Sequence, residues 1–207
     1  TKKSNSKIIA VTGSNGKTTI KELLYHILKK KFNCGKSVGN HNSTIGLPVS
    51  YLNCNLDNDY NIIEMGANKP GEIEKLCYYL KPTYSIITNI SNAHIENFKS
   101  INEIAETKSA IFRNIKKNGI CFLNMDDKYI SKMKVQNSIR FGSSNDADFK
   151  YIIKSNNKIE INNKIIHIPN SLIHVKESII GAYTVASSIG IKTTNFNESL
   201  KTFKIPN

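Results

Sequence analysis

A glycine-bounded turn followed by one lysine and two threonines lies near the start of the chain. It reads GSNGKTT and stands between an apolar run typical of a buried strand, Lys7–Thr12, and an amphipathic helix predicted over residues Thr18–Lys31. Such a loop can aim successive backbone N–H groups at a phosphate, at the positive end of the helix dipole. Lys17 would then face the β- and γ-phosphates, and the Thr18 hydroxyl would bind Mg²⁺. We therefore predict a phosphate loop for a nucleoside triphosphate, formed by Gly13, Ser14, Asn15, Gly16, Lys17, Thr18 and Thr19.

This loop is shorter than the general phosphate-loop motif. Gly13 opens it as GxxGKT, whereas the general motif places a glycine further upstream. A chance glycine-rich turn is the alternative interpretation, and the strand before it and the helix after it both disfavour that alternative.

Glu64 ends a second apolar strand, Tyr60–Met65 (YNIIEM). Open sheets of parallel strands bind ligands at the carboxyl ends of the strands, so this carboxylate is expected near the phosphate loop. Carboxylate oxygens suit Mg²⁺, which makes Glu64 a candidate metal ligand. A surface carboxylate at a strand end is the alternative.

Three other candidates do not stand out by residue type and spacing alone. His94 follows a third predicted strand, Tyr84–Asn89, and Lys108 lies in a helix predicted over Asn102–Ile115, where a lysine is ordinarily a solvated charge. The loop Gly39–Ser43 (GNHNS) presents amides and hydroxyls that also suit ordinary turns.

Strands and helices alternate along the first part of the chain, which predicts an α/β fold with a parallel sheet flanked by helices. A helix is expected from Pro70 to about Leu80, and a fourth strand over Gly119–Asn124. From Ser138 the pattern changes to short alternating runs broken by Asn-Asn pairs, which predicts a small antiparallel unit over about residues 138–170. Helices over Ile180–Ile191 and Asn197–Phe203 complete the expected elements.

Composition narrows the function classes. The 207 residues carry 29 basic and 16 acidic side chains, a net charge of +13, yet only Arg113 and Arg140 are arginines. Nucleic-acid surfaces rely on arginine and stacking aromatics, so dispersed solvated lysines are the preferred interpretation and no nucleic-acid partner is expected. The four cysteines show no metal or disulfide spacing. No apolar run approaches the roughly 20 residues that span a bilayer, and a cytoplasmic, monomeric protein without membrane insertion is expected.

Several blocks in one order are similar to the central ATP-binding domain of the Mur ligase family. They are TGSNGKTT, GNHNSTIGLP, IIEMGANKPGEI, TNISNAHIENF, AETKSAIF and NGICFLNMDD. The resemblance covers about Lys7–Asp127 closely and the remainder loosely. It implies that residues 1–207 form one such domain, with an N-terminal UDP-sugar domain and a C-terminal domain lying outside this chain.

The resemblance also implies roles for individual residues. Thr18 and Glu64 would hold Mg²⁺ on the ATP phosphates, and His94 would bind a second Mg²⁺. Lys108 stands where these ligases carry a carbamylated lysine, which would join His94 at that second ion. Asn40 and Asn42 would face the γ-phosphate and the substrate.

The implied reaction is ATP-dependent amide ligation in peptidoglycan precursor synthesis. ATP would phosphorylate the carboxylate of UDP-MurNAc-tripeptide, and the amine of D-Ala-D-Ala would attack the acyl phosphate. Lys17, His94 and Lys108 are the expected catalytic residues. Another Mur-type ligase, a folylpolyglutamate synthase-like enzyme and a nucleotide-binding module without catalysis are the alternatives.

The chain departs from the family pattern near its end. The family usually carries a G-x-H/Y-N segment that frames adenine, whereas this chain has Gly181-Ala182-Tyr183-Thr184. We therefore do not rely on an adenine contact at Thr184.

Overall fold

The computed structural model describes residues 6–37, 57–92 and 95–205. Strands and helices alternate through most of it, as the sequence predicts, and the strands form one nine-stranded sheet in the order β2-β3-β1-β4-β5-β6-β7-β8-β9. Pairing is parallel from β2 to β7 and antiparallel from β7 to β9. The strands are β1 (Lys7–Thr12), β2 (Cys34–Lys36), β3 (Tyr60–Glu64), β4 (Tyr84–Ile87), β5 (Ile120–Asn124), β6 (Ser138–Gly142), β7 (Phe149–Ser155), β8 (Lys158–Ile161) and β9 (Lys164–His167).

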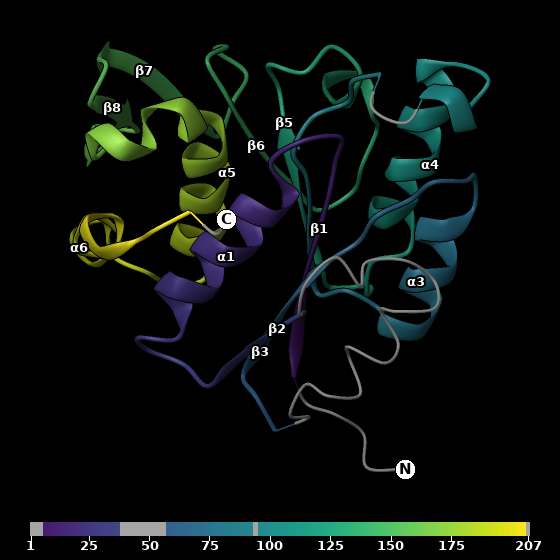
Figure 1. Ribbon diagram of the computed structural model, residues 1–207, viewed down its shortest axis with the longest axis horizontal. Coiled ribbons are helices and arrows are strands. Elements are labelled where there is room, and N and C mark those ends of the chain that lie inside the picture. Colours follow the sequence, from purple (N-terminus) through teal and green to yellow (C-terminus); the bar gives the residue numbers. More distant parts are fainter. Residues whose placement is uncertain (1–5, 38–56, 93–94, 206–207) are drawn as a thin grey trace.

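The helices cover both faces of the parallel sheet (Figure 1). One face carries α1 (Lys17–Leu28), α5 (Lys176–Ser188) and α6 (Thr193–Thr202), and the other carries α3 (Glu72–Leu80) and α4 (Ile101–Arg113). Each face has its own apolar core, because side chains alternate along buried strands. Ile9 and Val11 of β1 pack on the α1 side, whereas Ile8 and Ala10 pack on the α4 side.

Most predicted elements are confirmed within a few residues of their expected ends. The helix α1 ends at Leu28, before the expected Lys31, while α5 and α6 each begin four residues earlier than predicted. The edge strand β2 was not predicted, because three residues with a central glycine carry no alternating pattern.

The predicted boundary of the antiparallel unit was wrong. Strand β6 pairs in parallel with β5, so the antiparallel part begins at β7 instead of at Ser138. The segment 125–137 is long enough to cross over to a parallel neighbour, whereas a two-residue turn is not. Asn162 and Asn163 do form such a turn, both with positive φ (46° and 62°), and they join β8 to β9 as a hairpin.

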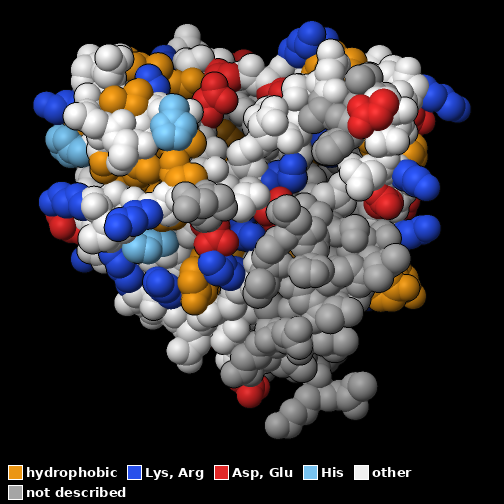
Figure 2. All heavy atoms as spheres, in the orientation of Figure 1, with side chains coloured by type: hydrophobic (Ala, Val, Ile, Leu, Met, Phe, Trp, Pro, Cys, Tyr) orange, Lys and Arg blue, Asp and Glu red, His pale blue; other side chains and the backbone are white. Residues whose placement is uncertain are grey.

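Two features of the described residues concern the surface charge and the character of the helices. Figure 2 shows Lys and Arg side chains spread over the visible face with Asp and Glu between them, instead of one continuous basic patch. Within the described residues, no helix has both the length and the apolar character to cross a membrane.

Candidate functional site

The loop between β1 and α1 lies at the carboxyl edge of the sheet and packs against the end of β4. Gly13 has φ 146°, and a Cβ built on it would lie 1.8 Å from the Thr88 hydroxyl oxygen. Only glycine fits this conformation and this close approach. The Thr88 hydroxyl in turn donates a hydrogen bond to the Asn15 carbonyl (2.5 Å). The loop therefore takes its shape from β4, which is distant in the sequence.

A set of hydrogen bonds joins this loop to residues 89–91. The Ser14 and Asn15 N–H groups donate to the backbone and side-chain oxygens of Asn89 (2.9 and 3.1 Å), and the Ser14 hydroxyl lies between the N–H and the carbonyl of Ser91. The Ser14 and Asn15 N–H groups therefore already have acceptors within the protein. The N–H groups of the first turn of α1 lack intrahelical acceptors by geometry and are the donors that suit a phosphate.

Lys17 folds back over the loop. Its ammonium donates a hydrogen bond to the Ser14 carbonyl (3.0 Å). Burial lowers the pKa of Lys17, and the nearby Glu64 carboxylate partly opposes this by raising it. The Lys17 ammonium, which is expected to bind the phosphates, thus lies against the phosphate loop.

Thr18 and Glu64 are brought together as the sequence predicts. The Thr18 hydroxyl donates a hydrogen bond to Glu64 Oε2 (2.9 Å), although 46 residues separate them. Glu64 is buried at the end of β3, with its N–H bonded to the Ser37 hydroxyl (3.0 Å). A hydroxyl and a carboxylate are hard oxygen donors, so this pair fits the ligand chemistry of Mg²⁺.

Lys108 is a buried residue of α4 that points at the phosphate loop. Only 5% of it is exposed, and its ammonium donates a hydrogen bond to the Gly13 carbonyl (3.1 Å). Burial, and secondarily the charge of Lys17, lowers its pKa to about 8. Part of the population is therefore a neutral amine near neutral pH, and a neutral amine is a nucleophile.

Some predicted residues fall outside the part of the chain that the structure describes. His94, Asn40 and Asn42 are in this group, so their expected roles stay predictions. Among the described residues, no cluster of three or more His, Cys, Asp or Glu side chains could hold a metal ion. Thr19, the last predicted loop residue, lies in the first turn of α1.

Thr184 lies in the core. It is fully buried, and its hydroxyl donates a hydrogen bond to the Ile180 carbonyl within α5 (3.0 Å). It is therefore closed to a nucleotide, in line with the departure of this segment from the family pattern.

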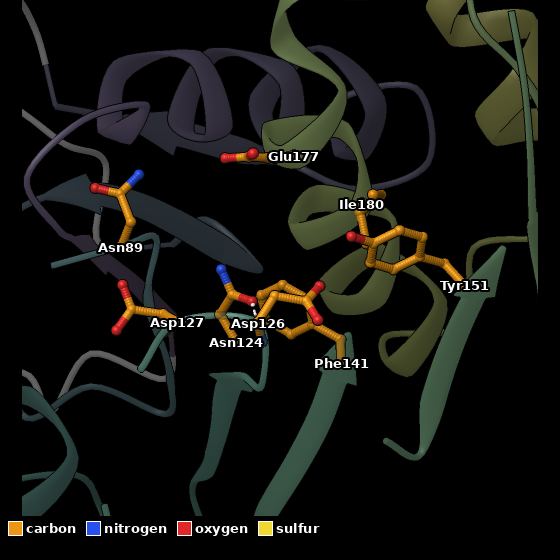
Figure 3. Close-up of a pocket in the computed structure, with 8 residues that line it drawn as sticks. All are labelled: Asn89, Asn124, Asp126, Asp127, Phe141, Tyr151, Glu177 and Ile180. Carbon is orange, nitrogen blue, oxygen red and sulfur yellow. Dashed lines mark hydrogen bonds between the residues drawn. The ribbon is translucent and has the colours of Figure 1, made fainter. Parts of the chain in front are cut away.

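A pocket beside the phosphate loop was not predicted as a site. Its volume is about 120 Å³, and it lies between the end of β4, the segment after β5 and the first turns of α5 (Figure 3). Glu177 lies on the opposite wall from Asn124 and Asp126, with Tyr151 at one side. The lining residues are Asn89, Asn124, Asp126, Asp127, Phe141, Tyr151, Glu177 and Ile180. They come from four strands or helices and two loops, so no single sequence run signals them, although Asn124, Asp126 and Asp127 lie in the NMDD block.

The fold and this site define a nucleotide-binding α/β domain with a phosphate loop. The model of the Mur ligase middle domain matches residues 11–189, and the chain belongs to the Mur ligase family.

Relatives and solved structures of the same family resemble this chain. A UDP-N-acetylmuramoyl-tripeptide–D-alanyl-D-alanine ligase of Buchnera aphidicola is 43% identical over 133 residues, which are 63% of this chain and 28% of that protein. The ligase of the same name from Rickettsia prowazekii is 40% identical over 157 residues, 72% of this chain and 35% of that protein. The structure of the MurF ligase of Thermotoga maritima in complex with ADP matches with a TM-score of 0.82 and 29% identity, covering 97% of this chain and 49% of that chain. The chain thus matches about a third of the length of these two relatives.

Proposed function

We propose that this chain is the central ATP-binding domain of an enzyme that joins D-Ala-D-Ala to UDP-MurNAc-tripeptide. The observation that carries the proposal is the convergence of Lys17, Thr18, Glu64 and Lys108 on one loop, from three elements far apart in the sequence. A domain that only bound a nucleotide would not need a buried lysine on the far side of the loop. The two substrates are taken from the names of the similar relatives: UDP-MurNAc-tripeptide supplies the carboxylate and D-Ala-D-Ala supplies the amine.

The phosphates of ATP would lie on the loop. The N-terminal N–H groups of α1 and the Lys17 ammonium would neutralise the oxygens that crowd together during transfer of the γ-phosphoryl group. The pocket next to the loop, about 120 Å³ in volume, would receive part of the nucleoside, since it offers amide and carboxylate groups together with the Phe141 and Tyr151 rings. The ADP complex of the similar Thermotoga ligase supports a nucleotide site in this domain.

Mg²⁺ would bind at two places. Thr18 and Glu64 would hold one ion beside the phosphates, and His94 with a carbamylated Lys108 would hold the other. When bound, these ions supply positive charge to the phosphate oxygens. The neutral form of Lys108 can attack CO₂ through its nitrogen and lose a proton, which converts a cation into a carbamate anion suited to Mg²⁺.

The reaction needs no nucleophile from the protein. A carboxylate oxygen of the tripeptide attacks the γ-phosphorus of ATP, the bond to ADP breaks, and an acyl phosphate forms. The amine of D-Ala-D-Ala then attacks the acyl carbon, an amide bond forms, and phosphate leaves with a proton lost from the nitrogen. Asn40 and Asn42 would position the carboxylate beside the γ-phosphate.

Further domains would complete the enzyme. The chain matches a middle domain and less than half the length of the Thermotoga ligase, which supports an N-terminal domain for the UDP-sugar and a C-terminal domain that closes over ATP. Because ATP and a UDP-linked precursor are the proposed substrates, we place the reaction in the cytoplasm.

Release of ADP and phosphate by the full-length protein tests this function. We expect release only when UDP-MurNAc-tripeptide and D-Ala-D-Ala are both present, and a loss of about 100-fold or more in Lys17→Ala. Lys30→Ala is the matched control, because Lys30 is an exposed lysine after the same helix. Nucleotide binding without turnover for any acceptor would instead identify a binding module.

A further inference from the structure

Lys21 is a buried lysine one helical turn after Lys17. Only 1% of it is exposed, a rare state for a lysine unless its charge is paired. Its Nζ lies 3.5 Å from Glu64 Oε2 and 3.4 Å from Glu22 Oε1. The proposed reaction assigns this residue no step.

The surrounding charges alternate in sign along a short network. Glu22 also pairs with Lys36 of β2, so the order is Lys36, Glu22, Lys21 and Glu64. Two positive and two negative charges balance one another, and the Lys21–Glu64 end of the network is buried while the Lys36 end is partly exposed. The network joins α1, β2 and β3 next to the phosphate loop.

Lys21 and Thr18 contact the same carboxylate oxygen of Glu64. Glu64 Oε2 accepts the hydrogen bond of the Thr18 hydroxyl and also faces the Lys21 ammonium. Lys17 is also a cation near Glu64, but the proposed reaction requires Lys17 at the phosphates. Lys21 is buried inside the fold and contacts this carboxylate directly, so it can serve as a counter-charge that is not needed at the phosphates.

We propose that Lys21 is a positioning residue for the metal site: it holds the Glu64 carboxylate against the Thr18 hydroxyl, so that both oxygens are in place when Mg²⁺ and nucleotide arrive. This inference rests on the proposed nucleotide and metal site. It extends the site by a side chain that would touch neither nucleotide nor metal.

The test measures the Mg²⁺ concentration at which a fluorescent ATP analogue is half bound by the full-length protein. We expect Lys21→Met to raise this midpoint by about tenfold, a size usual for loss of a residue that orients a metal ligand. Lys21→Arg restores the charge and brings the midpoint back toward the wild-type value. Glu22→Gln is the matched control, because Glu22 contacts the same lysine and is not one of the proposed metal ligands, and its midpoint should stay near that of the wild type.

The Glu64→Gln background separates positioning from general stability. If Lys21 acts through Glu64, Lys21→Met shifts the midpoint no further in that background. A purely structural role would lower the unfolding midpoint in both backgrounds and leave the Mg²⁺ requirement of the folded protein unchanged. An unchanged requirement in folded Lys21→Met, or an equal shift in both backgrounds, overturns the inference.

A double variant and the Mg²⁺ dependence of the wild type complete the experiment. If Lys21→Met alone does not fold, Lys21→Met with Glu22→Gln removes one charge of each sign and is measured in its place. If the wild type binds the analogue without any Mg²⁺ dependence, both the proposed metal site and the role of Lys21 fail. If the wild type depends on Mg²⁺ and the Lys21 variants match it, only the role of Lys21 fails.

Discussion

Lys108 couples α4 to the phosphate loop through a single ammonium group. Its folded-state pKa is about 8, against 10.5 for the ordinary group. Below pH 8 the residue is protonated in both the folded and the unfolded states, and the folded state bears the cost of a buried charge. Between these two values the unfolded state binds more protons, so the free energy of unfolding rises with pH.

A pH series of the free energy of unfolding therefore tests this environment. We expect the wild type to gain stability relative to Lys108→Met between about pH 8 and pH 10.5, by up to about 3 kcal/mol. Urea denaturation at each pH supplies the values, and only the difference between the two proteins counts, because buried cysteines and tyrosines titrate in the same range. A difference that stays constant with pH would contradict the low pKa. Lys116→Met, which removes an exposed lysine, should show no such trend.

The same amine should be carbamylated when CO₂ is abundant. With ¹³C-labelled bicarbonate, the wild-type protein is expected to show a carbamate carbon signal in the NMR spectrum that Lys108→Met lacks. An intact mass taken under the same conditions would carry the added CO₂. A spectrum identical to that of Lys108→Met would rule out the modification.

At the scale of elements, the contact between the phosphate loop and the end of β4 decides the shape of the loop. Gly13 and Gly71 both have positive φ, at 146° and 82°, but a Cβ at Gly71 would meet nothing within 4 Å whereas one at Gly13 would collide with Thr88. Both glycines thus have a positive φ, although at different values, and only Gly13 also has a steric contact that excludes a Cβ.

Gly71 provides a reference for a positive-φ glycine without a steric neighbour. Gly71→Ala should cost about 1 kcal/mol of stability, from strain alone. Gly13→Ala should cost about 2 kcal/mol more, because Thr88 and the loop must move apart, and it should also weaken nucleotide binding. Denaturant unfolding of both variants gives the comparison. Equal losses would mean that Thr88 does not constrain the loop.

At the scale of the whole molecule, binding of a nucleotide should increase the free energy of unfolding. A ligand that binds only the folded state adds about 2.7 kcal/mol when its concentration is 100 times Kd. We expect ADP with Mg²⁺ to raise the unfolding temperature of the wild type and of Lys30→Ala, but not that of Lys17→Ala. A shift of equal size in Lys17→Ala would place the nucleotide elsewhere on the protein.

The sequence predicted the fold where its signals are local. Strand β1, the loop and α1 are contiguous, and their apolar periodicity and glycine positions specify the unit without help from the rest of the chain. The β8–β9 hairpin is similar, since Asn162 and Asn163 tolerate the positive φ of its tight turn. Strand β6 was misassigned because a short alternating run has the same pattern in parallel and antiparallel pairing.

The candidate site divides in the same way. Lys17 and Thr18 follow from a local motif, and Glu64 follows from the rule that ligands bind at the carboxyl edge of a parallel sheet. Lys108 could be selected only through family resemblance, because in the sequence it is one helical lysine among many. The pocket lined by Asn89, Asp126 and Glu177 has no contiguous signal at all.

The sequence by itself determined the phosphate loop, the alternation of strands and helices, and the family, because each depends on the order and spacing of neighbouring residues. Only the tertiary structure decided which distant side chains converge on that loop. Lys108 reaches Gly13 across 95 positions of the chain, Thr18 reaches Glu64 across 46, and Lys21 is buried against the same carboxylate. These pairings depend on the order of the strands in the sheet and on burial, because a buried charge is costly unless it is paired. Neither the strand order nor the burial of a side chain can be obtained from spacing along the chain.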